Sequence, residues 1–89
     1  MGYLIELGIL EKIKNNLDSF VGQSIRLKAN RGRKRVLEVE GVLEQTYPKV
    51  FVIRLREKQM ERRLSYSYAD LLTKAVELSF QNKKIGYLS

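Results

Sequence analysis

A change in the spacing of apolar residues at Gly22 constrains the fold of this chain more than any other feature. Before Gly22, apolar residues recur at intervals of three and four, the spacing of one face of an α-helix. They are Ile9, Leu10, Ile13, Leu17 and Phe20. After Gly22, apolar and polar residues alternate, as in a strand with one buried face. We therefore predict a helix over about residues 9–18 and β-structure from about residue 23.

The alternating pattern recurs in several short segments that are joined by turns. It runs through residues 23–30, 37–44, 51–56, 64–66 and 76–80. Because no helices separate these segments, a three-layer α/β fold does not fit. We predict a mainly β protein, a small SH3-like or Sm-like five-stranded barrel with an N-terminal α-helix. Its 89 residues suit a single domain, 1–89, with the barrel at about 23–80 and a tail at 81–89 that shows no clear period.

Three local signals refine the prediction. Gly41 lies in the middle of the second predicted strand, which indicates a bulge or a sharp bend. Pro48 ends that strand because proline has no N–H for the ladder. Ser67 and Asp70 have the spacing of a capping box, which predicts one helical turn before the fifth strand.

The alternation also predicts which residues face the interior. These are Ile13, Ile25, Leu27, Val39, Leu43, Phe51, Ile53, Leu55, Leu64 and Leu78. We further expect Tyr66 to point inward and the ring of Tyr68 to plug one end of the barrel.

Histidine and cysteine are both absent from the chain. Their absence excludes disulfides, Ser-His or Cys-His catalysis, and the usual zinc ligands. The ten acidic residues show no clustering that resembles a paired-carboxylate site. We therefore predict that the protein is not an enzyme and uses no cofactor or metal.

The segment from Met1 to Leu10 is apolar but carries Glu6. It is too short to span a bilayer and does not have the layout of a signal peptide. We expect no membrane association. The lack of cysteine fits a reducing compartment, so we expect a cytoplasmic protein.

The net charge of +7 is concentrated in the segment from residue 26 to residue 35. That segment contains six basic residues and no acid: Arg26, Lys28, Arg31, Arg33, Lys34 and Arg35. The chain has 17 basic and ten acidic residues, so the remainder holds eleven against ten and is almost neutral. On a hairpin these side chains would form a positive patch that attracts phosphates or acidic protein surfaces. The alternative is a solvated loop that only adds solubility.

A second, weaker basic group occurs further along the chain. It comprises Arg54, Arg56, Lys58, Arg62 and Arg63, interleaved with Glu57 and Glu61. We interpret it as cross-strand ion pairs. The aromatic residues Tyr47, Phe51, Tyr66 and Tyr68 could stack bases, but their positions favour a structural role, and no RNP-type motif is present.

Three stretches resemble the Veg family of Gram-positive bacteria. They are Leu27–Lys34 (LKANRGRK), Thr46–Ile53 (TYPKVFVI) and Ser65–Thr73 (SYSYADLLT), and the strand at Val76–Phe80 also matches. The resemblance covers about residues 9–80. One departure is Arg31, which stands where the family pattern carries a second glycine and makes the loop more basic. Residues 1–7 lie outside the match.

The resemblance implies an SH3-like barrel and a role in stimulating biofilm formation, through transcriptional control and by opposing a repressor. It carries over no catalytic or ligand residue. Two functions remain in competition. The first is a regulatory module that binds a protein partner such as a transcription regulator. The second is a nucleic-acid binder that uses the basic hairpin with little sequence specificity.

We also predict self-association. An open barrel of this size leaves edge strands without partners, and Leu4, Ile5 and Leu7 add apolar surface at the N-terminus. Pairing of edge strands or docking of helices between two copies would cover both.

Overall fold

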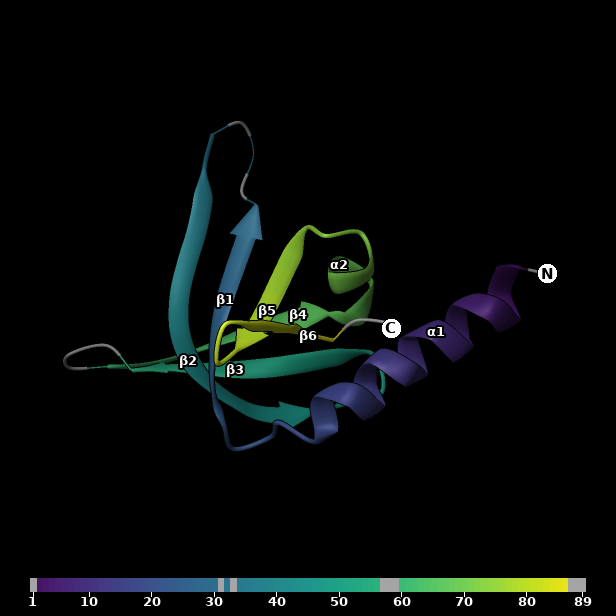
Figure 1. Cartoon of the computed structure of the whole chain (residues 1–89), viewed down its shortest axis with the longest axis horizontal. Helices are drawn as coiled ribbons and strands as arrows, with labels where there is room; N and C mark the ends of the chain where they lie inside the picture. The colour runs from purple at the N-terminus through teal and green to yellow at the C-terminus, as the bar shows by residue number, and fades with distance from the viewer. Residues whose placement is uncertain (1, 31, 33, 57–59, 87–89) are drawn as a thin grey trace.

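The computed structural model describes residues 2–30, 32, 34–56 and 60–86 (Figure 1). Two helices and six strands follow one another along the chain. They are α1 (Gly2–Asp18), β1 (Ser24–Asn30), β2 (Val36–Thr46), β3 (Val50–Arg56), β4 (Glu61–Ser67), α2 (Tyr68–Leu72), β5 (Val76–Phe80) and β6 (Lys83–Ile85). The predicted switch from helix to strand after Gly22 is confirmed. Helix α1, however, begins at Gly2 and not near Ile9.

The strands form one antiparallel sheet in the order β4-β3-β2-β1-β5-β6. The sheet is not closed, because β4 and β6 are its two edges, so the mainly β prediction is confirmed but the predicted five-stranded SH3-like or Sm-like barrel is not. There is also a sixth strand where we expected an aperiodic tail. Gln81 and Asn82 both have positive φ, 51° and 66°, which is the backbone of a two-residue hairpin turn. That turn folds Lys83 back beside Phe80.

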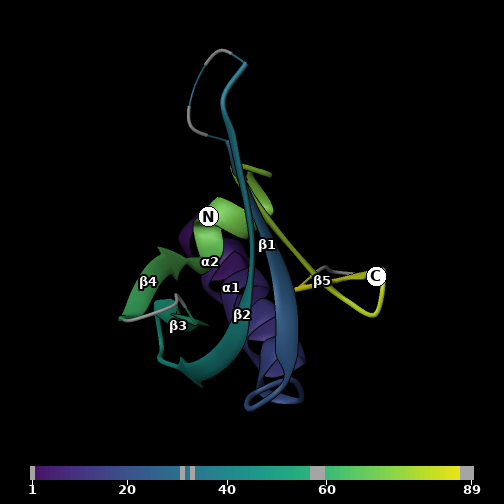
Figure 2. The same cartoon turned by 90° about the vertical axis from the view of Figure 1, so that its left-hand side faces the viewer.

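Strand β2 is long and pairs with different neighbours along its length. Its first part pairs with β1, from Asn30↔Val36 to Ser24↔Val42, and its last part pairs with β3. Figure 2 shows how strongly β2 curves between them. A Cβ at Gly41 would lie 2.8 Å from the carbonyl oxygen of Arg54 and 2.8 Å from Ile53 Cγ2. The bend predicted at Gly41 is therefore present, and the register shift follows between Leu43 and Gln45.

The core lies on the concave side of the sheet, under α1 and α2. Its buried residues are Ile13, Leu17, Ile25, Leu27, Ala29, Leu43, Phe51, Ile53, Leu55, Tyr68, Leu71, Val76, Leu78 and Ile85. Eight of the ten predicted interior residues are among them. Val39 and Leu64 are only half-buried. Val39 lies on the part of β2 that β3 does not reach, and Leu64 lies on an edge strand.

Helix α2 confirms the capping box, whereas Tyr68, which was expected to plug one end of a barrel, lies in the core of an open sheet. The Ser67 hydroxyl accepts from the Asp70 N–H at 3.2 Å, and the Asp70 carboxylate accepts from the Ser67 N–H at 3.1 Å. Tyr68 is completely buried, and its hydroxyl donates to the carbonyl oxygens of Tyr47 and Val50. The ring thus fastens α2 to the turn between β2 and β3.

Helix α1 rests on the sheet with its C-terminal half. Ile13 and Leu17 enter the core, and Asn16 Oδ1 accepts from the Gly86 N–H at 2.7 Å. The N-terminal end of α1 extends past the sheet (Figure 1). Within the part of the chain that the structure describes, no helix has the length and apolarity needed to cross a membrane.

Candidate binding surface on the basic hairpin

The β1–β2 hairpin projects from the body of the molecule as a two-stranded ribbon (Figures 1 and 2). Its base is held on both sides, because β1 pairs with β2 and, from Arg26 to Ala29, also with β5. The Asn30 N–H donates to the carbonyl oxygen of Ala75 at 2.8 Å. Beyond Asn30 and Val36 the chain turns without further strand partners among the described residues. The tip is thus displayed away from the core.

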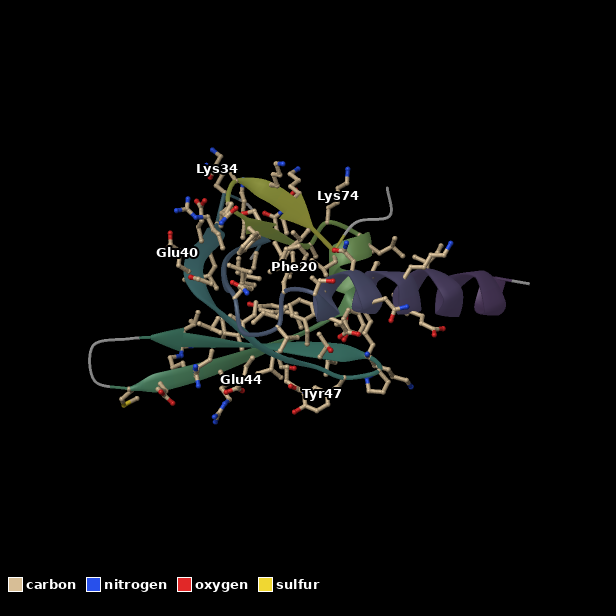
Figure 3. All side chains as sticks on the ribbon, turned by 60° about the horizontal axis from the view of Figure 1, so that its bottom comes forward. Phe20, Lys34, Glu40, Glu44, Tyr47 and Lys74 are labelled. Atoms are coloured by element: carbon tan, nitrogen blue, oxygen red, sulfur yellow. The ribbon has the colours of Figure 1, made fainter. Side chains whose placement is uncertain are left out.

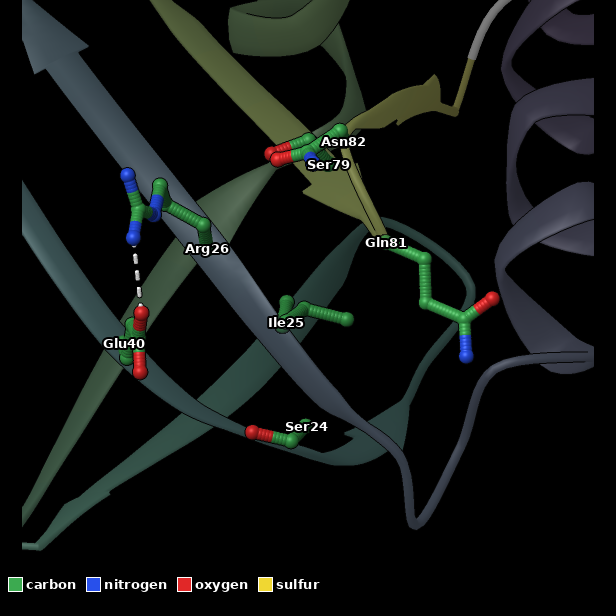
Figure 4. A pocket seen from close by; sticks show the side chains of 7 residues that line it. All are labelled: Ser24, Ile25, Arg26, Glu40, Ser79, Gln81 and Asn82. Atoms are coloured by element: carbon green, nitrogen blue, oxygen red, sulfur yellow. Dashed lines mark hydrogen bonds and ion pairs between the residues drawn. The ribbon is translucent and has the colours of Figure 1, made fainter.

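The base of the hairpin is electrically balanced. Arg26 lies opposite Glu40, and its guanidinium donates to Glu40 Oε1 at 2.8 Å (Figure 4). It also lies 3.6 Å from Glu38. The hydrogen bond with Glu40, and then the charges of Glu40 and Glu38, raise the pKa of Arg26 above its usual value. The positive charge of Arg26 is therefore compensated by two acids that are distant from it in the sequence.

Lys28 also has acids beside it. Its register partners are Glu38 on β2 and Glu77 on β5. Glu77 already pairs with Lys84, at 3.2 Å. Lys28 itself is exposed and forms no ion pair with a residue in the described ranges. The nearby carboxylates reduce the positive potential around Lys28, although Lys28 forms no ion pair with either of them.

The tip carries positive charge without acids. Lys34 and Arg35 are exposed, and within the described chain neither forms an ion pair. Gly32 and Lys34 have positive φ, 114° and 58°, and the Arg35 N–H donates to the Gly32 carbonyl at 3.2 Å. Arg31 and Arg33, two of the six predicted binding residues, lie outside the described residues.

The structure adds Lys74 to this surface. Lys74 follows α2 and lines, with Lys28, Asn30, Val36, Ala75 and Glu77, a shallow pocket of about 290 Å³. Lys34 and Lys74 point to the same side of the molecule (Figure 3). Lys74 could not be predicted from the sequence, because only the pairing of β1 with β5 brings it beside the hairpin.

Two arginines of the second basic group, Arg54 and Arg63, form the cross-strand ion pairs that we inferred from the sequence. Their acidic partner among the described residues is Glu44, which lies outside the interleaved segment. Arg63 lies 2.8 Å and Arg54 3.7 Å from Glu44 on β2. The two arginines are direct neighbours across β3 and β4, so Glu44 offsets a repulsion between them. Glu57 and Lys58 lie outside the described residues. Arg54 and Arg63 therefore offer less uncompensated charge than Lys34 and Arg35.

Neither the aromatic residues nor the polar pocket beside Arg26 adds a second site. Phe51 and Tyr68 are fully buried and cannot stack bases, whereas Tyr47 is exposed. The pocket in Figure 4 is lined by Ser24, Ile25, Arg26, Glu40, Ser79, Gln81 and Asn82, with a volume of about 190 Å³. Its two charged residues neutralise each other. Among the described residues, no group of three or more acids could hold a metal.

A protein-family model covers most of the chain. The model of the family described as biofilm formation stimulator VEG matches residues 8–79, which include the whole β1–β2 hairpin. No curated protein matches the chain.

Proposed function

The chain belongs to the VEG family of biofilm formation stimulators, and from this premise we propose that it is a non-enzymatic regulatory module. In this proposal it acts in the cytoplasm, on the transcriptional control of biofilm formation, by docking the tip of its β1–β2 hairpin on an acidic surface of a protein partner. The observation that carries the proposal is the separation of charge along the hairpin. Lys34 and Arg35 at the tip have no acidic partner among the described residues, whereas Arg26 at the base is paired.

The distribution of acids favours a protein partner over a nucleic acid. Glu38 and Glu40 are exposed on the same ribbon, and Glu77 lies on the next strand. A phosphate backbone lying along the hairpin would meet these carboxylates and be repelled. A protein surface of mixed charge can present cations to the base and acids to the tip. Such complementarity governs partner choice and the rate of encounter.

Nucleic acid is the second candidate, because a projecting two-stranded ribbon fits the major groove of duplex DNA. Lys28 and Lys74 would extend the contact of the tip. Phosphate contacts position a protein but carry no sequence information, so this binding would be weak and sequence-tolerant. If the four cations of the tip, Arg31, Arg33, Lys34 and Arg35, each contact a phosphate, the logarithmic salt slope should be about −3.6.

Two charge-reversed variants test the proposal. Lys34→Glu/Arg35→Glu lowers the net charge from +7 to +3, and Lys12→Glu/Lys49→Glu makes the same change at exposed positions away from the hairpin. The native protein is used to capture partners from lysate, with and without nuclease, and each variant is then compared. We expect capture that resists nuclease, is lost in the tip variant and is kept in the control.

Direct titration with duplex and single-stranded nucleic acid separates the two candidates. Under the protein-docking proposal, nuclease treatment does not change capture, and nucleic-acid affinity at physiological salt is negligible. Capture that disappears with nuclease, together with salt-dependent binding that the tip variant loses, would put the nucleic-acid candidate first. Equal capture by both variants would remove the hairpin tip as the binding site.

A further inference from the structure

Strand β4 presents a free edge of the sheet. It pairs with β3 along its entire length, from Val50↔Ser67 to Arg56↔Glu61, and no other described strand lies beside it. The N–H of Ser67 is already bound to the Asp70 carboxylate, and the other outer N–H and C=O groups of β4 are available to another strand. The opposite edge is β6, which has only three residues, two of them lysines. Short length and lysines are features that discourage strand addition, so β4 is the more receptive edge.

The free edge of β4 adjoins the core. Leu64 and Tyr66 are half-buried and lie opposite the buried residues Ile53 and Phe51. The rings of Phe51 and Tyr66 have centroids 6.2 Å apart. Met60, directly before the strand, is 68% exposed. A strand added here would extend the sheet and cover apolar surface that the chain leaves in water.

We propose that the occupant of this edge is β4 of a second copy, which pairs antiparallel about a twofold axis through Leu64. Leu64 is the middle residue of the seven in β4, so this register pairs all of them. It places Leu64 opposite Leu64, Arg62 opposite Tyr66, and Arg63 opposite Ser65. The contact is isologous, as in the commonest class of oligomers.

The side chains of β4 are compatible with self-pairing in this register. No like charges lie directly opposite one another, and Arg62 meets an aromatic ring, which a guanidinium favours. The charge of Arg63 is offset by Glu44 of its own chain. A shift of the axis to Arg63 would place two arginines opposite each other and leave part of β4 without a partner. Charge therefore disfavours the shift to Arg63, and the length of the paired segment favours the axis at Leu64 over a shift in either direction.

The contact consists of one strand pair, which lies at the small end of protein interfaces. We therefore expect a reversible dimer that forms with rising concentration in the micromolar to millimolar range. The hairpin tip takes no part in it, so the dimer is independent of the proposed function. The Lys34→Glu/Arg35→Glu variant should dimerise like the native chain.

Cysteine cross-linking tests the register directly, because the chain contains no cysteine. Opposite residues of an antiparallel pair have Cα atoms within disulfide range. Under mild oxidation, Leu64→Cys should form a covalent dimer, whereas Leu72→Cys, on α2 and 43% exposed, should remain a monomer. Equal cross-linking of the two variants would overturn the proposal.

Sedimentation equilibrium over a range of concentrations provides the second measurement. Leu64→Lys places two like charges on the axis and should weaken dimerisation about tenfold or more. Leu72→Lys makes the same substitution away from the edge and should have no effect, and the thermal midpoint of each variant checks that it is folded. A native protein that stays monomeric, or a dimer that survives Leu64→Lys, would overturn the proposal.

A third variant identifies the main competing contact. An apolar groove of about 680 Å³ lies beside α1 and is lined by Leu10, Pro48 and Ala69, among others. If Leu10→Lys abolishes the dimer and Leu64→Lys does not, the two copies meet through this groove, and the assignment to β4 is wrong.

Discussion

The two halves of strand β2 show how one element serves two purposes. The first half, residues 36–40, runs beside β1 on the projecting hairpin, where its exposed glutamates pair with Arg26. The second half, residues 41–46, pairs with β3 and includes the fully buried Leu43. Thr46 at its end donates to the Asp18 carboxylate of α1. Stability should therefore depend on the second half, and the first half should tolerate change that alters binding.

The largest effect should come from a truncation in the core beside the second half. Ile53 is completely buried and pairs with Leu43, so Ile53→Ala leaves a cavity. We expect a loss of about 2–5 kcal/mol in the free energy of unfolding, measured by urea titration. Val36→Ala, at a position 50% exposed on the hairpin, should have little effect. Similar losses for the two variants would abolish the contrast between the halves.

A methyl group at Gly41 should also lower the free energy of unfolding. The Cβ of Gly41→Ala would lie 2.8 Å from a backbone oxygen of β3, which cannot move without displacing that strand. Overpacking of this kind typically costs about 1–3 kcal/mol. Gly8→Ala is the matched control. It lies in α1 with open space around it, and alanine should stabilise the helix there. A neutral Gly41→Ala would show that β2 need not approach β3 so closely.

Removal of one hydroxyl tests how firmly α2 is fastened. Tyr68→Phe leaves the Tyr47 carbonyl without the donor that the hydroxyl supplies, whereas the Val50 carbonyl keeps the Tyr47 N–H at 2.8 Å. A buried acceptor that loses its partner costs about 1–3 kcal/mol, and we expect the lower part of this range. Tyr47→Phe, at an exposed ring, should leave the thermal midpoint unchanged.

The link between β2 and α1 should make stability depend on pH. The hydrogen bond from Thr46 is the largest influence and lowers the pKa of Asp18; burial opposes it, and the hydrogen bond and charge of Lys14 lower the pKa further. An acid with a lowered pKa stabilises the fold above the ordinary carboxyl range, and this contribution is lost as pH falls through the lowered pKa. Asp18→Asn should therefore flatten the acid side of the stability profile, measured as thermal midpoint against pH. An identical slope in the variant would contradict this assignment.

The smallest effect on stability should follow from charge reversal at the hairpin tip. Lys34 and Arg35 are exposed and have no ionic partner among the described residues, so Lys34→Glu/Arg35→Glu should change the free energy of unfolding by less than about 0.5 kcal/mol. The same variant is expected to lose the proposed partner. A large loss of stability would mean that the tip supports the fold and is not simply displayed by it.

Local chemistry made much of this structure predictable. Periodicity located α1 and the first five strands, because a one-sided burial pattern must follow the geometry of its own element. The Ser67–Asp70 capping box and the bend at Gly41 could also be predicted from the sequence, since each depends on residues that are close along the chain. Strand β6 was missed because its three residues are too few to show a period, and the positive φ of Gln81 and Asn82 is not visible in their identity.

The sequence by itself determined the order of elements as far as β5, most of the buried face and the excess of cations between residues 26 and 35. Only the tertiary structure decided how far that charge is compensated. Strand pairing brings Glu38 and Glu40 to Arg26 and brings Lys74 beside Lys28, and none of these neighbours is close along the chain. It likewise decided that the sheet stays open with β4 at an edge. Charge compensation and edge exposure depend on which strands become neighbours, and alternation within a strand carries no information about its partners.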